Sequence, residues 1–356
     1  MKTALSCMVS VSGFELTDNE KYLLNRYKPL GVTLFSRNIN TPSQVKKLIS
    51  EIKEVVDLED TLVGIDQEGG RVVRLKAPFF RSYLSQRSIG ALSDVELQKK
   101  AALLQAELIS ADLKGLGFNL NYAPCADVLS RETGSVLKTR CFSSDEKKVM
   151  ELSGLMSNVY HKNGIVPCLK HVPGHGRASL DPHLQLPKLD YPIKELQKDF
   201  FPFKKLADKV FMMMTAHIVL KELDDKPVTV SNKIIQDIIR KEIGFKGFLI
   251  TDAIDMKALR GTLTQKINDS LNAGCDAVCF CMGDEIGLRE VLENTPVLSD
   301  AALDRLKQVK NILKADTKNK SIQEMVQDYE KIKLLAPVFQ EDYDAVETLN
   351  QLIKQD

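Results

Sequence analysis

One loop, residues 170–187 (KHVPGHGRASLDPHLQLP), holds three of the five histidines of the chain, His171, His175 and His183, together with Asp181. An imidazole titrates near neutral pH, so such a loop suits either proton transfer or metal binding. For proton transfer, Asp181 stands two residues before His183, close enough to hold the imidazole of a general acid/base. For metal binding, the three histidines would be the ligands. The third alternative is an ordinary polar loop.

The spacing of His171 and His175 is unfavourable for a metal site of the helical type. Two histidines four residues apart share one face of a helix, but Pro173 and Gly174 stand between them and disfavour a helix. Three histidines on a loop can still bind zinc with one open position. A metal-dependent barrel hydrolase therefore stays an alternative, while the prediction is an enzyme without metal or cofactor.

The elements that must position this loop are short apolar runs that alternate with longer segments of helical periodicity. The runs are residues 4–11, 31–36, 61–66, 118–124, 165–170, 210–217, 247–252 and 276–281. Near-continuous apolar strands separated by helices indicate parallel strands buried on both faces, and eight such strands close a barrel. We therefore predict an α/β fold of the (β/α)8 TIM-barrel type. A doubly wound open sheet is the alternative, but only Gly13 follows the first run where that fold usually has a glycine-rich turn.

The chain is predicted to form a single catalytic domain over residues 1–356. The barrel spans about residues 1–297, and an amphipathic helical tail over about 298–356 wraps it, with no Pro/Gly/Ser-rich linker between them. The segments TDNE at 17–20 and TPSQ at 41–44 are typical helix starts.

Composition narrows the class of partner and compartment. The 356 residues are 27% charged with a net charge of +1, and no block of basic residues with interleaved aromatics indicates nucleic-acid binding. No segment approaches the about 20 apolar residues that a membrane span needs, and the short first apolar run fits a strand better than a signal peptide. Seven cysteines without a paired spacing indicate buried thiols in a reducing compartment. We expect a cytoplasmic monomer that acts on a small substrate.

In a TIM barrel the active site lies at the carboxyl ends of the strands, so the polar residues that close the apolar runs are the candidates. These are Asp66 followed by Glu68 and Arg71, Lys170 with His171, His217, and Asp252. The Gly69–Gly70 pair also lets the backbone approach a ligand closely. Asp252 is the candidate nucleophile, kept ionised if Lys170 and Arg140 lie nearby.

These segments together resemble glycoside hydrolase family 3, and within it the cytoplasmic bacterial β-N-acetylglucosaminidases. The resemblance covers nearly the whole chain, and its most specific block is KH-x-PGHG-x4-D-x-H at residues 170–183. Weaker matching segments are GVTLFSRNI, DQEGGRVVRL, NLNYAPCADV, MMMTAHI, GFKGFLITDAIDM and LNAGCDAVCFC. The chain departs from the family pattern at Pro182, at Ala253 and in KTRCFS at 138–143, and none of these changes removes a proposed catalytic group.

The resemblance implies a retaining exo-β-N-acetylglucosaminidase that acts on peptidoglycan fragments of the GlcNAc-anhydroMurNAc type during cell-wall recycling. Asp252 would be the nucleophile and His183 the acid/base, with Asp181 as its partner. The residues assigned to binding of the terminal sugar are Asp66, Arg71, Arg140, Lys170, His171 and Met256. Within the same fold, phosphorolysis is an alternative, because a histidine acid/base does not repel phosphate as a carboxylate would. A catalytically inactive sugar-binding barrel is the alternative outside enzymes, and it would be expected to lack Asp252 or His183.

Overall fold

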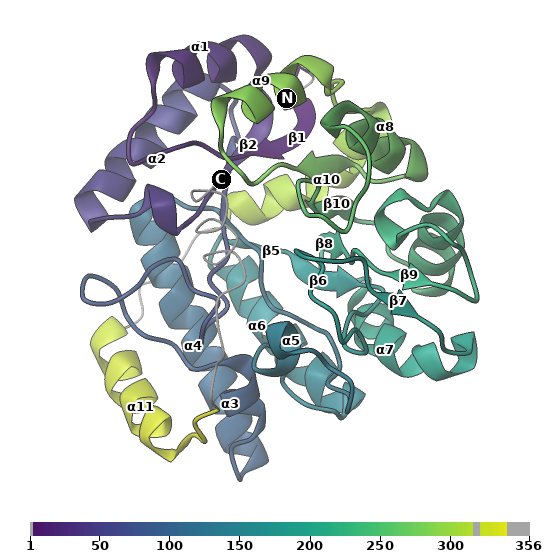
Figure 1. Ribbon diagram of the computed structural model, residues 1–356. Helices are drawn as coiled ribbons and strands as arrows, with labels where there is room; N and C mark the ends of the chain where they lie inside the picture. The colour runs from purple at the N-terminus through teal and green to yellow at the C-terminus, as the bar shows by residue number, and fades with distance from the viewer. Residues whose placement is uncertain (1–2, 316–320, 340–356) are drawn as a thin grey trace.

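The computed structural model describes residues 3–315 and 321–339, and its centre is a barrel of parallel strands surrounded by helices (Figure 1). The strands are β1 (Leu5–Val9), β2 (Pro29–Leu34), β3 (Leu62–Ile65), β4 (Leu120–Asn121), β5 (Val166–Pro167), β6 (Leu169–Val172), β8 (Met212–Thr215), β10 (Phe248–Ala253) and β11 (Ala277–Cys279). They pair in the order β5-β4-β3-β2-β1-β11-β10-β8-β6. Only Cys168 separates β5 from β6 along the chain, so the two ends of this order meet and the barrel closes. The predicted TIM barrel is confirmed, and the run at 165–170 is the one that divides into two strands.

Helices follow the strands around the outside of the barrel. The larger ones are α1 (Asp18–Tyr27), α2 (Pro42–Val56), α4 (Val95–Leu116), α6 (Glu146–Lys162), α7 (Ile193–Leu206), η3 (Ile234–Glu242), α8 (Leu263–Ala273) and α9 (Glu285–Asn294). Shorter elements in the loops are η1 (Ser36–Asn38), α3 (Gln86–Gly90), α5 (Ser135–Lys138), η2 (Val228–Val230) and the separate pair of strands β7 (Lys188–Leu189) and β9 (Val219–Leu220). Both predicted helix starts are confirmed: Thr17 forms a capping box with Glu20, and Thr41 caps α2 with Pro42 in its first turn.

One end of the barrel is closed by α10 (Asp300–Leu313). Leu306 and Val309 of this helix pack with the apolar side chains that fill the barrel, such as Met8 and Phe248. The helix crosses the amino ends of the strands, where Arg305 pairs with Asp276 at 2.5 Å and Lys310 pairs with Asp60 at 2.9 Å. The opposite end, at the carboxyl ends of the strands, is left for a site.

A last described helix, α11 (Ile322–Leu335), packs against α4. Tyr329 of α11 is buried, donates a hydrogen bond to the side-chain oxygen of Gln105 and accepts one from the Leu84 amide at 2.9 Å. Gln105 in turn donates to the Glu68 carbonyl at 3.0 Å and the Leu84 carbonyl at 3.1 Å. The helical tail predicted from residue 298 thus contains α10 and α11, while residues 316–320 and 340–356 of it lie outside the described residues. Among the helices of residues 3–315 and 321–339, none has the length and apolar character to cross a bilayer.

Candidate active site

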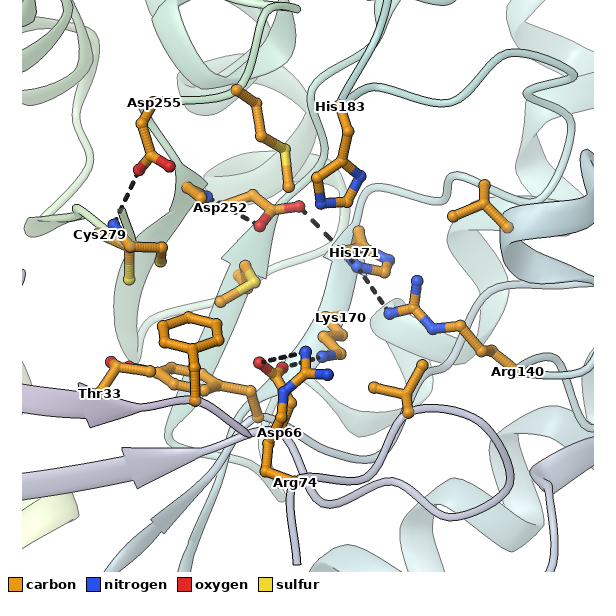
Figure 2. A pocket seen from close by; sticks show the side chains of 18 of the residues that line it. Thr33, Asp66, Arg74, Arg140, Lys170, His171, His183, Asp252, Asp255 and Cys279 are labelled. Carbon is orange, nitrogen blue, oxygen red and sulfur yellow. Dashed lines mark hydrogen bonds and ion pairs between the residues drawn. The ribbon is translucent and has the colours of Figure 1, made fainter. Parts of the chain in front are cut away.

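A pocket of about 890 Å³ opens at the carboxyl ends of the barrel strands (Figure 2). Of the nine residues that the sequence assigns to catalysis or binding, eight line the pocket: Asp66, Arg71, Arg140, Lys170, His171, His183, Asp252 and Met256. The ninth, Asp181, lies behind His183 and is hydrogen-bonded to it. The structure therefore brings together side chains that stand up to 190 positions apart in the chain, the separation of Asp66 and Met256.

Asp252 stands near the end of β10 and faces the pocket (Figure 2). One carboxylate oxygen accepts the Ala253 amide at 2.8 Å, and the other lies 4.0 Å from Nε2 of His171. Burial alone would raise the pKa of this carboxyl, but the positive charges that His217 and His171 carry when protonated in acid outweigh burial and lower the pKa to about 2. Asp252 is therefore an ionised carboxylate at neutral pH.

His217, which closes the sixth apolar run, fixes the backbone next to Asp252. Its Nε2 lies 2.9 Å from the Ala253 carbonyl oxygen and its Nδ1 lies 2.7 Å from the Thr229 hydroxyl. A carbonyl only accepts, so Nε2 carries the proton and Nδ1 accepts from Thr229. Burial lowers the pKa of His217, which agrees with this neutral form. His217 thus holds the strand end that carries Asp252.

His183 is held by Asp181 as the sequence suggests. One carboxylate oxygen of Asp181 accepts a hydrogen bond from Nδ1 of His183 at 2.8 Å and another from the backbone amide of His183 at 2.9 Å. Since a carboxylate accepts, Nδ1 carries a proton and Nε2 is left for the pocket. Figure 2 shows the His183 ring beside Asp252 at the pocket wall. The loop is anchored to the segment after β10, because the Ala258 amide donates to the Pro182 carbonyl at 3.2 Å.

A network of buried charges forms the floor of the pocket. Lys170 pairs with Asp66 at 2.8 Å and with Glu68 at 2.7 Å, and Arg140 reaches both oxygens of Glu68, at 3.0 and 2.8 Å. Burial disfavours the charged form of Lys170, but the two carboxylates outweigh it and raise the pKa of the ammonium. The sequence predicts that Lys170 and Arg140 keep Asp252 ionised, but these two cations pair with Asp66 and Glu68. The residues that lower the pKa of Asp252 are His217 and His171 instead.

His171 is oriented by a residue that the sequence pattern did not single out. Its Nδ1 lies 2.7 Å from a carboxylate oxygen of Asp127, and its Nε2 faces the pocket, 3.4 Å from Arg140. The other oxygen of Asp127 accepts the His175 amide at 2.7 Å. Asp127 follows the fourth apolar run. The expectation that functional residues lie at the carboxyl ends of barrel strands could therefore have identified it.

The two arginines of DQEGGRVVR have different partners. Arg71 lines the pocket, but its guanidinium donates to the Val136 carbonyl. Arg74, which the sequence pattern did not distinguish, lines the pocket and reaches Asp66 at 3.4 Å. Arg74 thus joins Asp66 and Lys170 in the charge network.

Comparison with known proteins assigns this chain to a family. Residues 4–314 match the model of the glycosyl hydrolase family 3 N-terminal domain. The chain belongs to glycosyl hydrolase family 3. It is a glycoside hydrolase by the same comparison, since it is 33% identical over 300 residues to the β-hexosaminidase of Tolumonas auensis, covering 81% of this chain and 87% of that protein. It is 30% identical over 279 residues to the β-hexosaminidase of Pseudomonas aeruginosa, covering 78% and 82% of the two chains.

Solved structures of the family have the same fold as this family 3 hydrolase. The structure of NagZ from Neisseria gonorrhoeae in complex with N-trifluoroacetyl-D-glucosamine matches with a TM-score of 0.82 and 25% identity, covering 94% of this chain and 99% of that one. A family 3 β-N-acetylglucosaminidase from Paenibacillus sp. matches with a TM-score of 0.80 and 25% identity, covering 94% and 68%.

Metal binding by the three loop histidines is the alternative for this family 3 hydrolase. Within the described residues, the group whose ligand atoms lie within 4.8 Å of one another is Cys125, Asp127 and His171, and it contains neither His175 nor His183. Asp127 already accepts hydrogen bonds from Cys125 and His171, and burial raises the pKa of the Cys125 thiol, which disfavours the thiolate that binds metal. The geometry suits a hydrogen-bond network that orients His171.

Activity of the hydrolase is therefore expected to survive chelation. Dialysis against a chelator should leave the rate on an aryl glycoside unchanged, because Asp252 and His183 need no metal for their roles. Assaying the dialysed enzyme with and without added zinc is the measurement. Loss on dialysis with recovery on zinc addition would show a metal-dependent reaction.

Lys170→Met is expected to destabilise the hydrolase by about 3–5 kcal/mol, because it removes the buried cation that buried Glu68 and partly buried Asp66 share. Urea unfolding measures the change in free energy. The control is Lys47→Met, which removes an exposed lysine paired with exposed Glu15 and should have little effect. Equal effects of the two changes would show that the charges around Lys170 are solvated.

Proposed function

We propose that this hydrolase removes terminal non-reducing β-linked N-acetylglucosamine by double displacement, with retention of anomeric configuration. The observation that carries the proposal is the meeting of an ionised Asp252 with His183, whose Nδ1 is held by Asp181, in one pocket at the carboxyl ends of the strands. The relatives named β-hexosaminidase and β-N-acetylglucosaminidase support this choice of substrate.

In the first step, Asp252 attacks the anomeric carbon while Nε2 of His183, in its protonated form, donates a proton to the departing glycosidic oxygen. This forms a glycosyl ester on Asp252. In the second step, neutral His183 takes a proton from water, which attacks the same carbon and releases Asp252. Retaining glycosidases normally use a carboxylic acid for this proton transfer, and here the Asp181–His183 pair takes that part.

The charge network is proposed to bind a single terminal sugar. Asp66 offers carboxylate oxygens to hydroxyl groups, and Lys170, Arg74 and Arg140 offer donors. Because Lys170 and Asp66 also bind each other, the network is rigid before substrate arrives, which lowers the entropy cost of binding. His171 and Met256 line the same pocket, and Arg71 completes its wall.

Peptidoglycan fragments of the GlcNAc-anhydroMurNAc type are the proposed natural substrates, and the proposed compartment is the cytoplasm. All seven cysteines have free thiols and six are buried, which agrees with a reducing environment. A small carbohydrate is the proposed partner of a monomeric enzyme.

The test is chromophore release from nitrophenyl β-N-acetylglucosaminide, run beside nitrophenyl β-glucoside. The expected result is turnover of the first with strong discrimination against the second, and a β-configured first product by NMR. Turnover that depends on added phosphate would favour phosphorolysis, and no turnover of either glycoside would refute the proposal.

A further inference from the structure

Within the loop that carries His183, residues 174–178 form a held segment, here called the loop root. The Thr133 hydroxyl and the Gly134 amide donate hydrogen bonds to two of its backbone carbonyls. Residues 179–180 follow the root and are exposed, and the acid/base pair comes directly after them. The chain therefore leaves a held segment and crosses an exposed one before it reaches the pocket.

Arg177, in the loop root, ties the root to α7. Its Nε donates to a carboxylate oxygen of Asp199 at 2.7 Å, and a terminal nitrogen donates to the Glu195 carbonyl at 3.2 Å. The guanidinium also lies over the Tyr191 ring, 4.8 Å from the ring centre. The side chains of Arg177 and Asp199 are only 17% and 4% exposed, so water does not screen the pair as it would at the surface.

Asp199 lies directly against the loop root as well. A Cβ at Gly174 would lie 2.8 Å from the Asp199 Cβ, and Gly174 has a φ of +134°, so glycine lets the root pack this closely on α7. The other charged groups near the pair are Glu195, 4.0 Å from Arg177, and Asp127. Asp199 thus holds the root twice, by packing on Gly174 and by pairing with Arg177.

The path from the loop root to the acid/base is short. Asp181 stands four residues after Arg177, with exposed residues 179–180 between them. On the far side, the Pro182 carbonyl accepts the Ala258 amide at 3.2 Å. The direction in which the chain leaves the root therefore helps to set where the acid/base pair lies. A displacement of about 1 Å at a catalytic group can cost about a hundredfold in rate.

We infer that Arg177 and Asp199 are positioning residues for the acid/base, and that their ion pair directs the loop so that His183 reaches the glycosidic oxygen. The inference rests on the proposed function, because it concerns the proton transfer assigned to His183. Arg177 occupies one of the four open positions in the block KH-x-PGHG-x4-D-x-H, so the family pattern does not assign it. Neither Arg177 nor Asp199 is among the described residues that line the pocket, so the pair acts through the loop and not on the sugar.

The experiment compares kcat/KM on the disaccharide of two β-linked N-acetylglucosamine units with kcat/KM on nitrophenyl β-N-acetylglucosaminide. Both values report cleavage of the glycosidic bond, but only the disaccharide needs a proton from His183. R177M should lower the ratio of disaccharide to nitrophenyl kcat/KM about tenfold. D199N should lower it about threefold, because the amide still accepts a hydrogen bond without the charge. Assays at about pH 7.5 keep Asp199 ionised, since burial raises its pKa to about 6.

Two further variants separate positioning from general damage to the fold. R177K keeps a cation opposite Asp199 and should restore most of the wild-type ratio. In a His183→Ala background, R177M should change the ratio no further, because the group that the pair positions is already gone. The matched control is K198M, which removes the α7 lysine next to Asp199 that pairs with Glu146 at 3.7 Å, and it should keep the wild-type ratio.

An unchanged ratio in R177M and D199N, or an equal loss on both substrates, would overturn the role of the pair. A further fall of the ratio when R177M is added to His183→Ala would overturn it too. If R177M does not fold, D199N carries the same test, because asparagine keeps the packing against Gly174. Each of these results leaves the proposed function standing as long as the wild type cleaves the nitrophenyl glycoside. Absence of that cleavage would overturn the proposed function, and the role of the pair with it.

Discussion

Asp252→Asn is expected to lower turnover about a thousandfold or more, which corresponds to about 4 kcal/mol of transition-state stabilisation. The amide is nearly isosteric with the carboxylate, but it cannot attack the anomeric carbon. Because the pKa of Asp252 is lowered to about 2, the carboxylate is ionised throughout the neutral range and is lost only as the pH falls toward that value. Activity above about pH 4 should therefore not be limited by protonation of Asp252. Rates on nitrophenyl β-N-acetylglucosaminide measure the effect.

The matched comparison for Asp252→Asn is Asp255→Asn, in the same TDAIDM segment. Asp255 also lines the pocket, but its carboxylate accepts the Cys281 amide at 2.8 Å, and burial raises its pKa. The Asp255→Asn variant should therefore retain far more activity than the Asp252→Asn variant. Circular dichroism should be unchanged for Asp252→Asn. If Asp252→Asn retained more than about a tenth of the rate, Asp255 would become the candidate nucleophile.

His183→Ala is expected to impair cleavage of a natural disaccharide far more than cleavage of a nitrophenyl glycoside. A sugar alkoxide is a poor leaving group and needs a proton from His183, whereas nitrophenolate leaves without one. General acid catalysis contributes about 10²–10⁴-fold, so the ratio of the two rates should change by about that factor. Parallel assays of both substrates with wild type and variant give the ratio.

Asp181→Ala should change this ratio in the same direction but less, because it removes the carboxylate that holds Nδ1 of His183 and leaves the imidazole in place. A control is the loop variant Gln185→Ala, which alters an exposed side chain two residues after His183. An unchanged ratio in His183→Ala would mean that His183 is not the proton donor and that the loop histidines only bind.

The barrel was predictable because each strand carries its own signal. Runs such as residues 247–252 are apolar on both faces, as only strands buried inside and outside a barrel need to be. The division of the run at 165–170 into β5 and β6 was not predictable, since it arises from pairing with β4 on one side and β8 on the other. Such pairing depends on tertiary contacts that no local pattern contains.

The site was predictable to the extent that strand ends identify it. Asp66, Lys170 and Asp252 close apolar runs, and the structure places all three in one pocket. The sequence could not decide between Arg71 and Arg74, because a loop with two glycines does not fix which arginine faces inward. Nor could it show that Asp127 pairs with His171, since that bond joins residues 44 positions apart.

The contact of α11 with the barrel links this helix to the charges in the active-site pocket. The family match ends at residue 314, so α11 lies beyond it. Yet Tyr329 donates a hydrogen bond to Gln105, which donates one to the Glu68 carbonyl. The Glu68 carboxylate in turn pairs with Lys170 and Arg140. A helix outside the matched family domain thus supports the charge network of the pocket from behind. Substitutions in α11 are therefore expected to alter the position of these charges while every residue that lines the pocket stays the same.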